Sequence, residues 1–319
     1  MFGYLRLFLA FLVLLSHVGV KFYTLNPGVI AVVIFYILAG YVVSHIYIDI
    51  FSHKKNRLFT FYKDRFLRIF PLYIYVIVIT VIFLLLTSYA DPKFTFLNML
   101  NNLTIIPLNY YMYIDSTVLS EPNWWLIPPA WSLGTELQAY LLLPFALMFK
   151  RFKIALALIS LIVYILANFS VIHPDYYGYR FVVGVFFIFL LGSAIQSYKK
   201  EDKQFIFFIS LALIILIPLS IYTGNFSKTY TVETFIGLLI GIPVVLFLSK
   251  TNKKLPFNSL FGSFSYALFL THFLAIWIMK YLHLYSENVY LNILPVTIIS
   301  ILISAIGVLF IEKSVYNHK

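Results

Sequence analysis

Ten apolar stretches, each about 17 residues or longer and separated by polar breaks, constrain this chain more than any other feature of its sequence. A helix of this length matches the hydrocarbon thickness of a bilayer. The chain is 62% hydrophobic and 11% charged, whereas soluble domains have about 45–50% apolar and about 25% charged residues, so a soluble fold is excluded. We therefore expect an all-α, polytopic membrane protein with about ten transmembrane helices. The expected spans lie near residues 5–20, 28–48, 69–89, 130–149, 154–170, 181–198, 205–222, 232–249, 264–282 and 290–311.

The distribution of Lys and Arg predicts the direction of these spans. With the N-terminus in the cytoplasm, 18 of the 23 basic residues fall on the cytoplasmic side, which agrees with the excess of Lys and Arg in cytoplasmic loops. Both termini are then cytoplasmic, and the long connection 90–129 lies at the external interface. The net charge of +11 is explained by membrane topology, so no nucleic acid is expected as a partner. The absence of cysteine excludes disulfide and thiolate chemistry.

The first span has a basic residue near its start and a histidine deep inside it. Arg6 and His17 are eleven residues apart, which is within about 20° of three helical turns, so both side chains are expected on one face. Arg6 can reach the cytoplasmic headgroups and act as a membrane anchor. His17 is expected near or beyond the bilayer midplane, where an ionisable residue usually faces a cavity or pathway. A hydrogen-bonded core histidine is the alternative interpretation.

Polar residues in two later spans are expected at a similar depth. Ser132, Glu136 and Tyr140 follow at four-residue intervals in NWWLIPPAWSLGTELQAYLLLP, so they share one face of the fourth span. A carboxylate at this depth has to be paired, protonated or in contact with water. Glu136 is therefore either a site residue or the partner of a buried Arg or Lys. His272 in FGSFSYALFLTHFLAIW is expected near mid-membrane, as a catalytic residue or as a core histidine bonded to a neighbouring helix.

Two arginines precede the third span on the cytoplasmic side. Arg65 and Arg68 in FYKDRFLRIFPLY are three residues apart, so their guanidinium groups are expected on one helix face, where they could clamp a phosphate. The alternative is that both residues only reflect the positive charge of cytoplasmic loops.

Together these segments resemble the membrane acyltransferase-3 family, whose members transfer acyl groups, usually acetyl, to carbohydrates and other acceptors. The resemblance runs in order from the first span to the last and implies a single acyltransferase-3 membrane domain over residues 1–319. AVVIFYILAGY is similar to a second-helix motif of the family, with Ala39 in place of its serine, and SYALFLTH is similar to Ser-Tyr-x-x-Tyr-Leu-x-His, with Phe269 in place of its second tyrosine. The residues that match family motifs include Arg6, His17, Gly40, Arg65, Arg68, Trp131, Ser132, Leu133, Glu136, Tyr140, His272 and Glu312.

The resemblance implies transfer of an acyl group, most often acetyl, from cytosolic acetyl-CoA to a hydroxyl of a carbohydrate or glycolipid acceptor. The expected location is a bacterial inner membrane, with membrane lipid as a further partner. Aromatic residues between Asn109 and Trp125 could stack on sugar rings or form an interfacial belt. A polytopic transporter or flippase of a lipid-linked glycan is the alternative, since it would show the same hydropathy and charge bias.

The resemblance also implies roles for individual residues. His17 is the expected general base, because histidine exchanges a proton near neutral pH. Glu136 is expected as a second catalytic residue that orients the imidazole or binds the acceptor, and no metal is expected. The implied donor-binding residues are Arg6, Arg65 and Arg68, and the implied substrate contacts are Trp131, Ser132, Tyr140 and His272.

Overall fold

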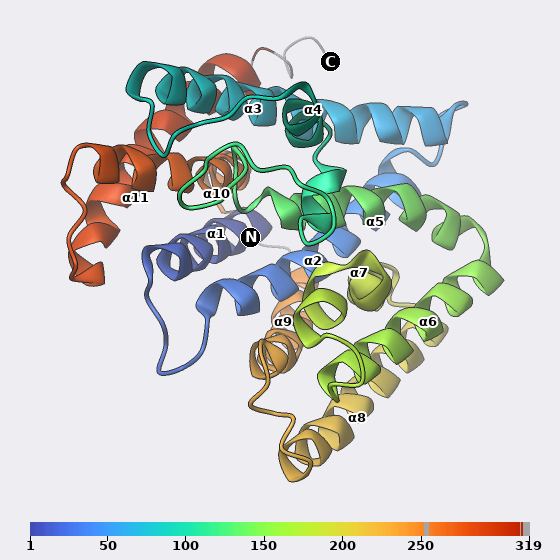
Figure 1. Ribbon diagram of the computed structural model, residues 1–319. Coiled ribbons are helices and arrows are strands. Elements are labelled where there is room, and N and C mark those ends of the chain that lie inside the picture. Colours follow the sequence, from blue (N-terminus) through green and yellow to red (C-terminus); the bar gives the residue numbers. More distant parts are fainter. Residues whose placement is uncertain (252–254, 313, 315–319) are drawn as a thin grey trace. The chain divides into compact units, whose positions relative to one another are not determined.

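A computed structural model describes residues 1–251, 255–312 and 314, and the regular elements in this part of the chain are helices (Figure 1). The expected all-α fold is therefore confirmed. The α-helices are α1 (Phe2–Val18), α2 (Pro27–His45), α3 (Arg57–Thr87), α4 (Phe96–Thr104), α5 (Ala130–Met148), α6 (Lys150–Asn168), α7 (Val182–Ser197), α8 (Lys200–Tyr222), α9 (Thr231–Ser249), α10 (Asn258–Tyr281) and α11 (Val289–Ile306). Shorter 3-10 and π-helical segments are η1 (Ile46–Ile50), η2 (Ile106–Tyr110), η3 (Tyr176–Arg180) and η4 (Gly307–Glu312).

Eight helical segments among the described residues are long and apolar enough to cross a membrane. They correspond to eight of the ten expected spans, so the chain is a multi-pass membrane protein. The other two expected spans fall short by this measure: α1 has only 17 residues, and α5 carries Glu136 and Gln138 among its apolar residues. Ten crossings and cytoplasmic termini stay predictions. The eight segments are Pro27–Ile50, Arg57–Thr87, Lys150–Asn168, Tyr176–Ser197, Lys200–Tyr222, Thr231–Ser249, Asn258–Tyr281 and Val289–Glu312.

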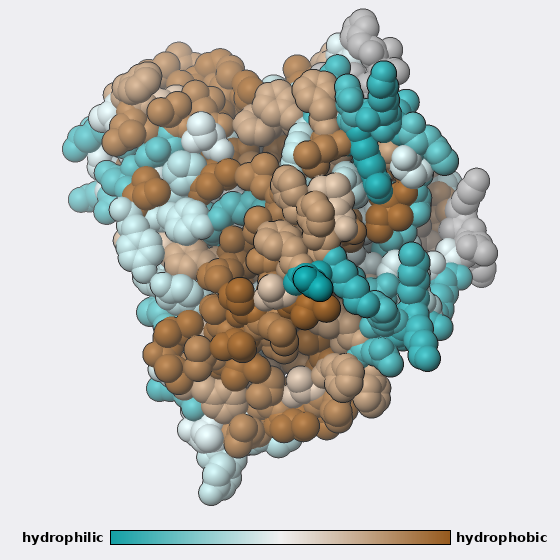
Figure 2. Space-filling view, turned by 90° about the vertical axis from the view of Figure 1, so that its right-hand side faces the viewer, coloured by the Kyte–Doolittle hydropathy of each residue, from teal (hydrophilic) through white to brown (hydrophobic). Residues whose placement is uncertain are grey.

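Exposed hydrophobic side chains identify the lipid-facing side of a spanning helix. On α3, Ile74, Val78, Ile82 and Leu85 are exposed, whereas Val76 is fully buried. The spacing of three or four residues places the exposed side chains on one face. Such a stripe suits a hydrocarbon solvent and would be unfavourable in water. Hydrophobic residues also cover broad areas of the face seen in Figure 2.

The chain divides into two compact units. Unit 1 comprises Met1–Lys21, Tyr62–Gly134 and Lys254–Lys319, and unit 2 comprises Phe22–Phe61 and Thr135–Lys253. Both α3 and α5 run from one unit into the other, because the boundaries fall within these helices. Each unit therefore has its own set of packed helices.

In unit 1, α1 packs along α10, and α10 also packs against α11 (Figure 1). Gly3 permits a close approach at the start of α1, since a Cβ atom on Gly3 would lie only 1.8 Å from the carbonyl oxygen of Asn258. The backbone N–H of Gly3 also donates to Asn258 Oδ1 at 2.9 Å. These two contacts fix the register between α1 and α10, and hence which of their residues face each other.

In unit 2, α2 packs against α7 and α9. Glycines from both partners lie where α2 meets α7: a Cβ atom on Gly40 would be 1.9 Å from the carbonyl oxygen of Phe189, and one on Gly192 would be 1.9 Å from that of Ile37. Small residues at such crossings are typical of membrane helices, because they let the backbones approach closely. The family-motif residue Gly40 therefore has a packing role.

The connection 90–129 has a buried core of its own within unit 1. Asn102 is fully buried, and its side-chain nitrogen donates to the carbonyls of Asn98 and Ser116 at 2.8 and 2.9 Å. The side-chain oxygen of Asn102 accepts from the backbone N–H of Leu126 at 2.8 Å. One asparagine thus joins three parts of the segment, as expected of a buried polar group with its hydrogen bonds satisfied.

Candidate active site

The two histidines singled out from the sequence are in contact in unit 1. His17 Nδ1 lies 2.8 Å from His272 Nε2. His272 is fully buried in the interior of α10, and His17 is half-buried. His17 occupies the last turn of its helix rather than the interior, because Gly19, in a left-handed conformation, ends α1. The hydrogen bond from His272 to a neighbouring helix, which one of the two interpretations predicted, is confirmed, and His17 is the partner of His272 in this bond.

Aromatic rings line the histidine pair. The ring centre of Phe273 lies 4.8 Å from that of His17 and 5.3 Å from that of His272. Half-buried Trp124, from the connection 90–129, lies 5.7 Å from Phe273. An aromatic residue of the segment expected on the external side is thus one side chain away from the pair. Trp124 lies within the aromatic segment 109–125 that the sequence indicated, whereas Phe273, the neighbour of His272 in the chain, was not identified as a site residue.

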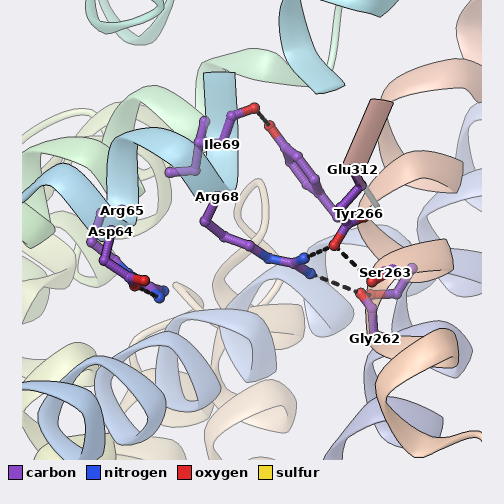
Figure 3. A network of polar contacts seen from close by, with 9 residues as sticks. Asp64, Arg65, Arg68, Ile69, Gly262, Ser263, Tyr266 and Glu312 are labelled. Atoms are coloured by element: carbon purple, nitrogen blue, oxygen red, sulfur yellow. Dashed lines mark hydrogen bonds and ion pairs between the residues drawn. The ribbon is translucent and has the colours of Figure 1, made fainter. Parts of the chain in front are cut away.

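A second polar cluster in unit 1 surrounds Arg68 (Figure 3). Arg68, on α3, forms an ion pair with Glu312 and donates a hydrogen bond to the carbonyl of Gly262 at 3.3 Å. The Ser263 hydroxyl donates to the same Glu312 carboxylate at 2.7 Å. The side chains of Arg68 and Glu312 are 21% and 12% exposed. Two residues that match family motifs, 244 positions apart in the sequence, are therefore direct partners.

The other arginine of the expected phosphate clamp has a different partner. Arg65 pairs with Asp64, its neighbour in sequence (Figure 3). Asp64 was not identified as a site residue, although it is the single acidic residue in the basic segment 54–68. Both guanidinium groups thus bind carboxylates, and a phosphate would have to compete with Asp64 and Glu312. Arg6 lies in α1, about three turns before His17.

Glu136 and Tyr140 belong to unit 2, whereas the histidine pair belongs to unit 1. The Tyr140 hydroxyl donates a hydrogen bond to the Glu136 carboxylate. The expectation that these two residues share a helix face is confirmed, because side chains four residues apart meet on a helix. The role of Glu136 in orienting His17 or binding the acceptor stays a prediction.

Trp131 and Ser132 precede that pair in α5 and lie in unit 1. Both are buried, and the Ser132 hydroxyl donates to the carbonyl of Pro129 at 3.0 Å. Their roles as substrate contacts stay predictions. In the described part of the chain, no group of three or more His, Asp or Glu side chains is arranged to hold a metal ion.

Unit 1 also has an apolar groove of about 630 Å³ between α1, α10 and α11, lined by residues such as Leu7 and Phe264. Two hydroxyl groups in its wall already donate to backbone carbonyls: Tyr4 to Pro256 at 2.8 Å, and Thr297 within α11 at 2.7 Å. The groove therefore suits a hydrocarbon chain better than the amide-containing arm of coenzyme A, whose polar groups would be desolvated there without compensation.

Comparison with known proteins agrees with this architecture. The sequence profile of the acyltransferase-3 family, described as an acyltransferase domain, matches residues 2–312. The chain therefore belongs to this family and is a membrane acyltransferase. An uncharacterized protein of Aquifex aeolicus (strain VF5) is 41% identical over 214 residues, which cover 64% of this chain and 96% of that protein. No solved structure matches the chain.

Proposed function

We propose that this acyltransferase moves an acetyl group from acetyl-CoA to a hydroxyl of a carbohydrate or lipid-linked glycan, in a bacterial inner membrane, with His17 as general base. The observation that carries this proposal is the hydrogen-bonded pair of His17 and His272 inside a membrane acyltransferase domain. Acyl transfer to a hydroxyl needs a group that accepts the hydroxyl proton, and a half-buried imidazole is suited to this task.

A single base, His17, is sufficient for every proton transfer of the proposed reaction. The acceptor oxygen attacks the thioester carbonyl while His17 takes the hydroxyl proton, so a C–O bond forms and the imidazole becomes an imidazolium. The C–S bond then breaks, and the departing thiolate of coenzyme A recovers that proton from His17. The products are an O-acetyl ester and free coenzyme A, and His17 returns to its neutral state.

The arginines on the predicted cytoplasmic side support a phosphorylated donor. Arg68 is only 21% exposed and Arg65 only 11%, so each keeps a guanidinium group in a partly desolvated position, where charge-assisted hydrogen bonds to phosphate are strong. When acetyl-CoA binds, its phosphates would replace the carboxylates of Asp64 and Glu312 as the partners of the two arginines. That exchange makes donor binding dependent on both arginines.

The surroundings of the histidine pair support a carbohydrate acceptor. Half-buried Trp124 lies next to Phe273, which in turn contacts both imidazoles. An aromatic face offers a large apolar contact for the C–H face of a sugar while leaving its hydroxyl groups free to react. A sugar stacked on Trp124 would approach His17 from the side of the connection 90–129.

The test is release of coenzyme A by the purified protein in lipid nanodiscs, given acetyl-CoA with and without a soluble polysaccharide. Because the chain has no cysteine, a thiol reagent detects released coenzyme A without a background from the protein. We expect release of coenzyme A by the wild type and none above background by His17→Ala. The control is His53→Ala, which removes an exposed histidine that is not part of the pair and should release coenzyme A like the wild type.

Two outcomes would contradict the proposal. Release at the wild-type rate by His17→Ala would remove His17 as the base. Failure of well-folded wild type to bind acetyl-CoA at all would favour the transporter or flippase interpretation.

A further inference from the structure

The backbone of α10 decides which nitrogen of His272 carries a proton. His272 Nδ1 lies 3.1 Å from the carbonyl oxygen of Leu268. A carbonyl oxygen can only accept, so Nδ1 is the donor and carries the hydrogen. A second proton on His272 would place a charge at a fully buried position, which is costly to desolvate. His272 Nε2 is therefore the unprotonated nitrogen, and it acts as an acceptor.

The acceptor nitrogen of His272 in turn determines which nitrogen of His17 carries the proton. His17 Nδ1 lies 2.8 Å from the lone pair of His272 Nε2, so Nδ1 of His17 has to be the donor. In a neutral imidazole the other nitrogen is then unprotonated. His17 Nε2, which points away from His272, is left as the basic nitrogen.

The ring geometry shows that this hydrogen bond is linear. A ring nitrogen lies about 1.1 Å from the centre of its imidazole, so a contact of this length allows the two centres to be at most about 5 Å apart. The observed centres are 5.0 Å apart, and the ring planes differ by only 10°. The rings of His17 and His272 therefore lie edge to edge, almost in one plane, with the N–H bond aimed at the lone pair. This is the geometry that favours a strong hydrogen bond.

We propose that His272 is a positioning residue that holds the proton of His17 on Nδ1 and keeps Nε2 as the base. This inference rests on the proposed acyl transfer. His272 would act as the buried carboxylate does behind the histidine of a serine hydrolase, by fixing both the tautomer and the orientation of the ring. A neutral acceptor does this without adding a negative charge to the membrane interior, where an ionised group is costly. When His17 gains a proton, its bond to His272 becomes charge-assisted and strengthens.

Two substitutions of His272 separate positioning from packing. In His272→Gln the side-chain carbonyl can accept from His17 Nδ1, whereas in His272→Leu an apolar side chain fills the site and offers no acceptor. We expect His272→Leu to lower kcat about 100-fold with little change in the KM for acetyl-CoA, and His272→Gln to recover at least about a tenth of the wild-type kcat. His53→Ala is the histidine control and should match the wild type.

The tautomer itself is measured by ¹⁵N NMR of histidine-labelled protein in nanodiscs, with the His17 signals assigned from their loss in His17→Ala. We expect His17 to be protonated on Nδ1 in the wild type and in His272→Gln, and this preference to be lost in His272→Leu. A wild-type His17 protonated on Nε2 would overturn the inference, as would equal kcat in His272→Leu and the wild type. The NMR result does not depend on turnover, so an inactive protein with the expected tautomer would refute the proposed function but not the positioning.

Discussion

Replacing Gly40 with alanine is expected to destabilise the packing of α2 against α7. The added Cβ atom would lie 1.9 Å from the carbonyl oxygen of Phe189 and 2.6 Å from its carbonyl carbon, where non-bonded carbon contacts are about 3.5–4.0 Å. The obstacle is backbone, so the helices have to separate by more than about 1 Å. Overpacking of this kind lowers the free energy of unfolding by about 3 kcal/mol, whereas the higher helix propensity of alanine raises it by about 1 kcal/mol.

The net cost of about 2 kcal/mol corresponds to a fall in Tm of roughly 3 °C, if the 319 residues have the unfolding entropy per residue of globular proteins. Far-UV circular dichroism is the suitable assay, because the four tryptophans all lie in unit 1. Gly262→Ala is the matched control, since its Cβ atom would lie 3.9 Å from the nearest atom, and its Tm should equal or exceed that of the wild type. A Gly40→Ala protein that melts at the wild-type temperature would refute the close approach at Gly40.

Three further predictions concern the arginines of the expected phosphate clamp, Glu312 and His17. Arg65→Ala and Arg68→Ala should each raise the KM for acetyl-CoA about tenfold, because each variant would lose a charge-assisted contact to phosphate. Arg151→Ala, which removes an exposed arginine, is the control. An unchanged KM for acetyl-CoA in the first two variants would argue against the clamp. Glu312→Gln should lower stability by about 1–2 kcal/mol, because it weakens the partly buried ion pair with Arg68; an additive double-mutant cycle would show that the two side chains do not interact. A protonated His17 cannot accept the hydroxyl proton, so coenzyme A release should fall as the pH is lowered; release that rises on acidification would exclude this role.

The fold class and the membrane location followed from the sequence, because both depend on the length and composition of continuous stretches. Each apolar stretch satisfies its own backbone hydrogen bonds as a helix, whatever its neighbours are. The pairing of Glu136 with Tyr140 was predictable for the same reason, since it depends only on a four-residue spacing within one helix. The end of α1 at Gly19 also has a local cause, although its effect on the position of His17 was not anticipated.

The partners of the candidate site residues came only from the tertiary structure. His17 and His272 are 255 residues apart in sequence, and Arg68 and Glu312 are 244 apart. Motifs identified these residues one by one, but no helical periodicity relates residues on different helices. Their contacts depend on which helices pack together and in which register, and close backbone approaches such as the one at Gly3 set that register. The sequence by itself therefore determined a membrane acyltransferase with a candidate base, whereas only helix packing decided which nitrogen of that base is free of a proton.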